Sequence, residues 1–158
     1  MNRNRGVLTI VSILALVIVL FAAGKVMAQG NSEVMSLVEK GVVMAVVEGE
    51  EAVLKAIGDP KGPFIEGDLY LFAGPLDKVT MSAHPYKPEL VGKDMSTFRD
   101  NHGNFLFFEF VKTALEDGAG WIEYWWPKPG ATKASLKMTY VMKVPGKNMY
   151  IGGGYYVE

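Results

Sequence analysis

The stretch of residues 120–140, GWIEYWWPKPGATKASLKMTY, constrains the fold of this chain more than any other. It contains all three tryptophans, which lie within six residues of each other and are followed by a Pro-Lys-Pro-Gly break and a long alternating run. Aromatic and β-branched residues suit a pleated, half-buried surface, so the stretch predicts two strands joined by a loop. A sheet with large aromatic side chains on both faces needs other elements packed against one face. On the other face, the aromatic side chains either line a ligand site or belong to the core.

Side chains alternate between the two faces of a strand, which sorts this stretch further. Trp121 and Trp125 are expected on one face of the first strand, and Tyr124 and Trp126 on the other. In the second strand one face is apolar, with Leu136, Met138, Tyr140 and Met142. Lys137 lies on the opposite face, between apolar neighbours. It is either a buried ammonium that needs an anionic partner or an exposed lysine on an edge strand.

The rest of the chain predicts an α+β fold. Helices are predicted where apolar residues recur at helical spacing, over residues 33–48, 50–57 and 104–117. Strands are predicted over residues 69–73 and 79–84 as a hairpin, in the tryptophan stretch, in a long run to Val144, and over residues 149–157. This order favours an antiparallel sheet of five strands with helices packed on one face. The loop of residues 84–98 would cover the other face.

The first 28 residues are predicted to be a secretory signal peptide. Arg3 and Arg5 form a basic start, residues 7–23 are apolar, and residues 26–28 fit the small-residue rule before cleavage. The apolar run of about 17 residues is near the lower limit for a membrane span, so an uncleaved anchor is the alternative. In both cases residues 29–158 form one domain outside the cytoplasm, which is periplasmic or secreted.

Composition excludes several functions. The chain contains 16 Lys and Arg, 17 Asp and Glu, and no cysteine. Arg3, Arg5 and Lys25 lie in the predicted signal peptide, which leaves 13 basic residues and a net charge of −4. A mildly acidic domain lacks the basic patch that nucleic acid requires. Without cysteine, the chain has no disulfide, no thiolate nucleophile and no Cys-bound metal.

Catalytic motifs are also missing from the sequence. Its two histidines, His84 and His102, have no spacing that builds a metal site, and no nucleophile elbow is present. Residues 152–154 are three glycines, but they fall inside a predicted strand and no helix follows to cradle a phosphate. We therefore expect no enzyme, no cofactor and no metal. A periplasmic hydrolase that uses His84 is the remaining catalytic alternative.

Several separate stretches share the order and spacing of one family. They are LYLFAGPLDKVTMSAHPYKPELVGKDM, FRDNHG, GWIEYWWPKP, SLKMTYVMKVPG and IGGGYY, and the match covers roughly residues 33–157. In these stretches the chain resembles the single Cache domain, type 2. The resemblance implies a PAS-like antiparallel sheet of five or six strands with a long N-terminal helix, in an extracytoplasmic sensor. Such domains bind small ligands, often short carboxylates, between the sheet and the loops over it.

The resemblance extends to particular positions. His84 with Pro85 matches the family's His-Pro pair, Tyr124 its GW…Y pattern, and Lys137 with Tyr140 its K…Y pattern. We expect a small organic anion, such as a short carboxylate, held by the lysine, the histidine and aromatic donors. The predicted ligand-binding residues are His84, Tyr86, Phe98, Tyr124, Trp126, Lys137 and Tyr140.

Family members are commonly the sensing part of chemoreceptors and kinases, with a second membrane span and a cytoplasmic output domain. Here the chain stops at Glu158, directly after the last predicted strand. We therefore expect a stand-alone member that delivers or sequesters a ligand, or that acts through a membrane-bound receptor or kinase. A homodimer through the N-terminal helix is also compatible with the sequence. The alternative is a protein-interaction module of an envelope signalling complex that binds no small ligand.

Overall fold

The computed structural model describes residues 30–157. The chain divides into Met1–Glu33 and a compact domain, Val34–Glu158. The predicted signal peptide or anchor, residues 1–28, lies outside the described residues. Within the described residues, no helix is both long and apolar enough to cross a membrane.

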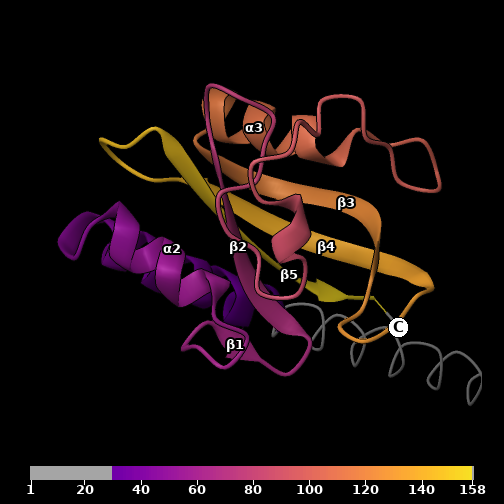
Figure 1. Cartoon of the computed structure of the whole chain (residues 1–158), viewed down its shortest axis with the longest axis horizontal. Coiled ribbons are helices and arrows are strands. Elements are labelled where there is room, and N and C mark those ends of the chain that lie inside the picture. The colour runs from indigo at the N-terminus through magenta and orange to yellow at the C-terminus, as the bar shows by residue number, and fades with distance from the viewer. Residues whose placement is uncertain (1–29, 158) are drawn as a thin grey trace, which may run out of the picture. The chain divides into compact units, whose positions relative to one another are not determined.

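Helices precede and interrupt the strands of the domain (Figure 1). A first helix covers residues 30–47. The elements after it are α2 (Glu50–Gly58), β1 (Ile65–Glu66), β2 (Leu69–Pro75), a short 3₁₀ helix η1 (Pro88–Leu90), α3 (Leu106–Glu116), β3 (Ala119–Pro127), β4 (Ala134–Lys143) and β5 (Met149–Tyr156). Glu50 and Glu51 lie in the first turn of α2 and Lys55 in its last, an order that complements the helix dipole.

The five strands form one antiparallel sheet in the order β1-β2-β5-β4-β3. This confirms the predicted α+β fold with a five-stranded antiparallel sheet and a long N-terminal helix. The predicted aromatic hairpin consists of β3 and β4, which pair from Ala119↔Met142 to Pro127↔Ala134. The last strand in the chain, β5, lies in the middle of the sheet between β2 and β4.

One predicted strand is wrong. The fifth strand is β1, which pairs with the start of β2, and not residues 79–84. Those residues reach β2 at a single bridge, Ala73↔Ala83. Pro85 follows directly and has no N–H with which to extend a ladder. The segment therefore belongs to the long connection between β2 and α3.

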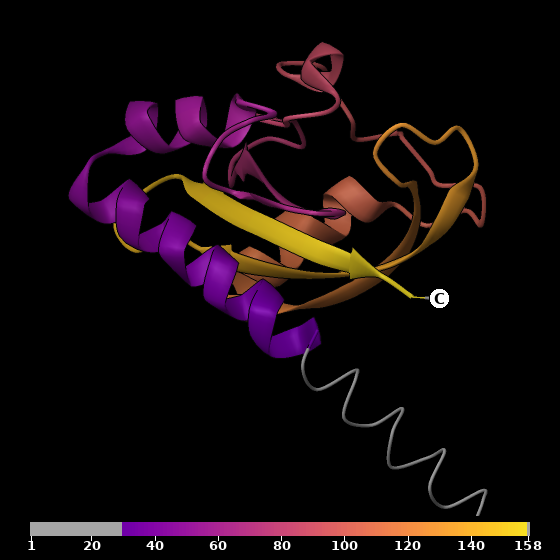
Figure 2. The same ribbon diagram turned by 90° about the horizontal axis from the view of Figure 1, so that it is seen from below.

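Helices cover both faces of the sheet. The first helix and α2 pack on the face that carries Leu71 and Ile151, and Figure 2 shows the first helix running along the sheet. In contrast, α3 packs against Phe72 and Tyr150 on the opposite face. The prediction of helices on one face describes the first helix and α2, whereas α3, whose buried stripe includes Phe107 and Phe110, covers the aromatic face.

The middle strand carries three successive glycines because side chains from its neighbours lie over it. A Cβ atom on Gly152 would come within 2.6 Å of the Phe72 ring, and a Cβ atom on Gly153 within 2.7 Å of Leu71. Both distances are too short for real carbon contacts, so larger residues would push the two layers away from the sheet. The glycines thus bring rings from β2 down onto the centre of the sheet.

Candidate ligand-binding site

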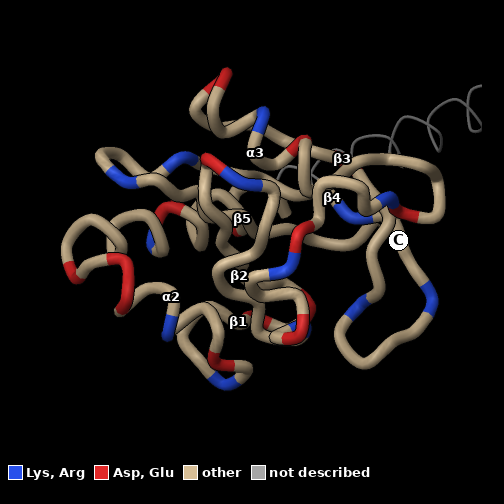
Figure 3. Tube along the Cα trace, turned by 45° about the horizontal axis from the view of Figure 1, so that its top comes forward, with Lys and Arg blue, Asp and Glu red and all other residues tan. Residues whose placement is uncertain are grey.

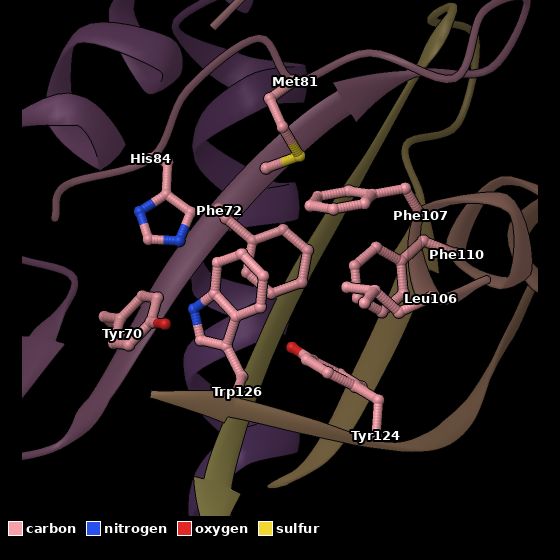
Figure 4. Close-up of a pocket in the computed structure, with 9 residues that line it drawn as sticks. All are labelled: Tyr70, Phe72, Met81, His84, Leu106, Phe107, Phe110, Tyr124 and Trp126. Carbon is pink, nitrogen blue, oxygen red and sulfur yellow. The ribbon is translucent and has the colours of Figure 1, made fainter. Parts of the chain in front are cut away.

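The aromatic face of the sheet encloses two neighbouring cavities. The inner cavity measures about 10 Å³ and is lined by Tyr70, Phe72, Met81, His84, Leu106, Phe107, Phe110, Tyr124 and Trp126 (Figure 4). The outer cavity measures about 300 Å³ and is lined by Tyr70, His84, Tyr86, Lys87, Trp126 and residues 127–131. Tyr70, His84 and Trp126 line both cavities and form the partition between them. The outer volume suits a small organic ligand, and the inner one is close to the size of one water molecule.

Lys137 is a fully buried lysine next to this partition. Its side chain has no exposed surface, and its Nζ has no hydrogen-bond partner among the described residues. The Nζ lies 3.7 Å from the centroid of the Tyr70 ring and 5.0 Å from that of Tyr156, which are cation–π contacts. Burial lowers the pKa of Lys137 well below its ordinary value, and Asp68 opposes this effect. Of the two possibilities left by the sequence, the structure shows the buried one.

His84 is held in one tautomer by the backbone. Its Nδ1 accepts hydrogen bonds from the backbone N–H groups of Tyr86, at 3.2 Å, and Lys87, at 3.0 Å. Nδ1 therefore carries no proton, and Nε2 is the donor. Burial and the charges of Lys137 and Lys87 lower the pKa of His84 to about 3. At neutral pH the site thus contains an uncharged imidazole that offers one N–H.

The aromatic side chains of the partition interact with one another. The Tyr70 hydroxyl interacts with the side chains of Trp126 and Tyr156. The Tyr156 hydroxyl donates to the backbone oxygen of Pro127 at 2.7 Å. Burial raises the pKa of Tyr156 to about 12, which keeps it protonated.

Positive groups and hydrogen-bond donors surround the cavities. Lys87 and Lys128 line the outer cavity, and no Asp or Glu lies among the described residues that line either one. Figure 3 shows that the loop between β3 and β4 carries basic positions and no acidic one. Lys128 forms an ion pair of 3.6 Å with Asp68 at the exposed rim. This arrangement favours an anion as the occupant.

The structure brings together six of the seven predicted ligand-binding residues around the partition or beside it. His84 and Trp126 line both cavities, Tyr86 lines the outer one and Tyr124 the inner one. Phe98 lies at the edge, where its ring is 6.0 Å from Trp126. Lys137 stands behind the Tyr70 ring, beside the partition and not on a cavity wall.

Tyr140 is not brought to this site. It lies on the face that the first helix covers, with its ring 5.2 Å from that of Trp121. The reason is the alternation of side chains, because Tyr140 and Lys137 are three residues apart on β4 and point to opposite faces. The K…Y pattern of the family therefore spans the sheet instead of defining one wall.

Several lining residues were missed in the sequence. The largest group is Tyr70 and Phe72 on β2 with Phe107 and Phe110 on α3. Tyr70 and Phe72 are two positions apart in a predicted strand, so they were identifiable as a pair that shares a face. Nothing local indicated that this face, and not that of Leu71, would meet the lysine of β4.

A cavity between an antiparallel PAS-like sheet and the segments over it is typical of a ligand-binding sensor domain. The family model of the Cache domain matches residues 50–158, which is more than half of the chain. The chain therefore belongs to the Cache domain family, as the resemblance of its sequence stretches predicted.

Relatives of known role are sensors of chemotaxis systems. Over 78 residues, 49% of this chain, it is 38% identical to the methyl-accepting chemotaxis protein McpP of Pseudomonas putida, of which it spans 14%. A Cache chemosensory domain solved for its carboxylic acid recognition matches with a TM-score of 0.71 at 28% identity, covering 85% of this chain and 97% of that one. A periplasmic sensor domain of a chemotaxis protein matches with a TM-score of 0.64 at 32% identity, covering 85% and 94%. A methyl-accepting chemotaxis protein from Vibrio parahaemolyticus, at 19% identity and a TM-score of 0.73 over 88% and 96%, shows the shared fold.

Proposed function

We propose that this domain is an extracytoplasmic sensor-type module that binds a short organic anion, namely a carboxylate. The observation that carries the proposal is the buried Lys137 side chain, whose Nζ has no hydrogen-bond partner among the described residues. Removing an ion from water costs several kcal/mol unless an opposite charge compensates it. A bound carboxylate supplies that charge. The similarity to a Cache domain that recognises carboxylic acids supports the same class of ligand.

The surrounding groups match such a ligand. Lys137 supplies the charge, and the Nε2–H of His84 adds a directed hydrogen bond without adding a second charge. The Tyr70 ring covers the ammonium at 3.7 Å, so a carboxylate reaches it when this ring moves aside and joins the outer cavity to Lys137. Lys87 and Lys128 at the outer cavity attract the anion to its entrance. The proposed role is recognition of the anion.

The proposal includes a location and partners. The predicted signal peptide or anchor places the domain in the periplasm or outside the cell. The relatives belong to chemotaxis systems, which supports a role in signalling through a membrane-bound receptor or kinase. Ligand binding would then be communicated to such a receptor or kinase. Co-purification with membrane proteins in the presence and absence of ligand tests this part.

Isothermal titration calorimetry of the full-length chain with acetate, propionate and pyruvate tests the ligand class. We expect at least one acid to bind and to raise the melting temperature, as any ligand selective for the folded state does. Lys137→Met keeps the length of the side chain and removes the charge, and it should weaken binding at least about 100-fold, as expected for a charged hydrogen bond.

Lys143→Met is the matched control, because Lys143 is exposed on the same strand. This variant should bind with the affinity of the unmodified chain. The proposal fails if none of the acids binds, or if Lys137→Met binds as tightly as Lys143→Met.

A further inference from the structure

The outer side of α3 exposes large apolar side chains. Phe105, at the start of the helix, is 36% exposed, and Phe108 and Leu115 are each 50% exposed. With the exposed Lys112 they follow one another at intervals of three, four and three residues. This spacing places all four on one side of the helix and is typical of the seam between two packed helices. We call these four residues the α3 stripe.

The other side of α3 already has its partners in the domain. Leu106, Phe107 and Phe110 line the inner cavity, and Figure 4 shows them directed toward the other lining residues. The core therefore explains why that side is apolar, but it does not explain the stripe. Single exposed apolar residues are ordinary, whereas three in line along one helix indicate a surface that another molecule covers.

A hollow adjoins the C-terminal end of the stripe. It measures about 550 Å³, and its walls include Leu76, Leu115, Lys143 and Lys147. It has room for an aromatic side chain, and the two leucines give it an apolar wall. One side of α3 thus combines phenylalanines at its N-terminal end with a hollow at its C-terminal end.

Such a surface fits a second copy of the same chain. A two-fold axis between residues 111 and 112 would pair two α3 helices in antiparallel directions. Phe108 of each copy then lies opposite Leu115 of the other, at the edge of the hollow. Each copy contributes the same two contacts, which is the property of an isologous interface.

Phe105 extends this match at both ends of the pair. In the antiparallel arrangement it lies opposite Gly118 of the second copy. The carbonyl oxygen of Gly118 accepts a hydrogen bond from the N–H of Lys143, which is one of the residues that line the hollow. The Phe105 ring of one copy therefore reaches the hollow of the other.

The charges of this side of α3 are complementary to themselves as well. Lys112 lies within the stripe and Glu116 at its border, and neither has an ion pair within residues 30–157. Helical side chains lean toward the N-terminus of their helix. In the antiparallel pair this direction carries Lys112 of each copy toward Glu116 of the other, while the two lysines lean apart. The arrangement therefore forms two equivalent ion pairs and avoids a contact between like charges.

We propose that the α3 stripe is a docking surface for a second copy of this chain, joined as an antiparallel two-fold dimer. The inference goes beyond the proposed function and does not depend on a ligand. It also differs from a dimer through the first helix, which lies on the opposite face of the sheet. One helix of 11 residues per copy makes a small interface, so the dissociation constant should lie at about 1–100 µM.

Disulfide trapping in the full-length chain tests the proposal. The chain has no cysteine, so a single introduced thiol reports on one position. Lys112→Cys places a thiol next to the two-fold axis, and brief oxidation by oxygen with a copper catalyst should link two copies. Val47→Cys, at a position of the first helix that is 76% exposed, is the matched control and should link at least about tenfold less. Non-reducing electrophoresis measures the linked fraction.

Substitutions in the stripe should prevent this linkage. Phe108→Glu or Leu115→Glu, each added to Lys112→Cys, places a carboxylate in the apolar seam and should lower the linked fraction at least about tenfold. Both positions are half exposed, so the domain should keep its fold, which circular dichroism verifies. Val43→Glu on the first helix, at 60% exposure, is the control and should leave the linked fraction unchanged.

A charge exchange tests the antiparallel arrangement without cysteine. Lys112→Glu and Glu116→Lys should each weaken dimerisation about three- to tenfold, because each removes two exposed ion pairs. The double variant re-forms the pairs with reversed signs and should restore the dissociation constant of the unmodified chain. Sedimentation equilibrium measures these constants.

The possible outcomes are decisive. Equal linkage of Lys112→Cys and Val47→Cys overturns the proposal, and stronger linkage of Val47→Cys overturns it in favour of a dimer through the first helix. Linkage that survives both Phe108→Glu and Leu115→Glu also overturns it. A double charge exchange that fails to restore association rejects the antiparallel pairing. Absence of acid binding would reject the proposed function and leave this dimer standing.

Discussion

The two faces of the sheet differ in chemistry although both are covered. The face under the first helix and α2 is mostly aliphatic, with Val34, Leu37, Val38, Leu71 and Ile151 in its cluster. The face under α3 carries aromatic rings, and the polar side chains of His84, Lys137 and Thr139 are buried on that side. The first face contains groups that gain from leaving water, and the second contains groups that lose unless a partner compensates them.

This difference indicates that the two faces of the sheet have different roles within one small domain. The aliphatic face supplies stability, whereas the aromatic face buries a lysine whose Nζ has no hydrogen-bond partner among the described residues and which, in our proposal, meets the ligand. Binding sites commonly reduce stability in this way, because a site prepared for a ligand is imperfect without it. Variants that act on one face and not on the other measure how far this separation holds.

The largest effect is expected on the aliphatic face. Leu37→Ala removes a buried side chain from the first helix and should lower the free energy of unfolding by about 2–5 kcal/mol. Val47→Ala, at a position of the same helix that is 76% exposed, should change it by less than about 0.5 kcal/mol. Urea unfolding measures both variants. Acid binding by Leu37→Ala, measured below its unfolding transition, should be unaltered, and a tenfold loss would show that the faces are coupled.

The aromatic face should respond to pH through His84. Its folded-state pKa of about 3 lies below the ordinary 6.5, so between these values the unfolded chain binds one more proton. The free energy of unfolding should therefore fall as the pH falls, by about 1.4 kcal/mol per pH unit. The range from pH 6 to pH 4.5 isolates this effect from Asp94 and Asp100, whose carboxyl pKa values lie below the ordinary 3.8.

His84→Asn should reduce the slope of the free energy of unfolding against pH by the contribution of one proton, about 1.4 kcal/mol per pH unit. The asparagine oxygen can replace Nδ1 as acceptor of the two backbone hydrogen bonds but does not titrate. His102→Asn, at an exposed histidine, serves as the control and should keep the slope. Equal slopes in the two variants would show that His84 is not the titrating group. Urea unfolding at several pH values measures them.

The smallest effect has the opposite sign. Lys137→Met replaces a buried lysine, whose Nζ has no hydrogen-bond partner among the described residues, by an apolar chain and should raise the free energy of unfolding by about 1–2 kcal/mol at pH 7. The pKa of Lys137 is lower in the folded chain, so the unfolded chain binds more protons, and stability rises with pH toward the ordinary value of 10.5. Thermal unfolding without ligand should show that Lys137→Met lacks this rise between pH 7 and pH 9. Destabilisation of the variant would mean that the ammonium supports the fold.

Much of the fold was predictable because its signals are local. The break after Trp126 and the alternation on both sides of it predicted the β3–β4 hairpin. The recurrence of apolar residues at helical spacing predicted α2 within one residue of Glu50–Gly58. These features depend on backbone preferences and on neighbours within a few positions, which are present in the sequence itself.

Long-range pairing decided the parts that were predicted incorrectly. Residues 79–84 have the composition of a strand. However, β1 pairs with the first residues of β2, and Ala83 is the only one of residues 79–84 that forms a bridge with β2. The apolar stripe of α3 predicts a buried helix and contains no information on which face it covers. Such choices depend on contacts between segments far apart in the chain.

The candidate site shows the same limit. Alternation in the sequence by itself determines that Tyr124 and Trp126 share one face of β3 and that Lys137 and Tyr140 lie on opposite faces of β4, because a strand repeats every two residues. That Lys137 lies on the same face as Tyr124 depends on the register between the two strands, which pairs these two residues. Only the tertiary structure decides that α3 and Tyr70 close over that shared face. Burial is a property of the whole packed domain, so the absence of a described hydrogen-bond partner for Lys137 Nζ is visible only after folding. That buried amine distinguishes this face from an ordinary aromatic core and is the basis of the proposed binding site.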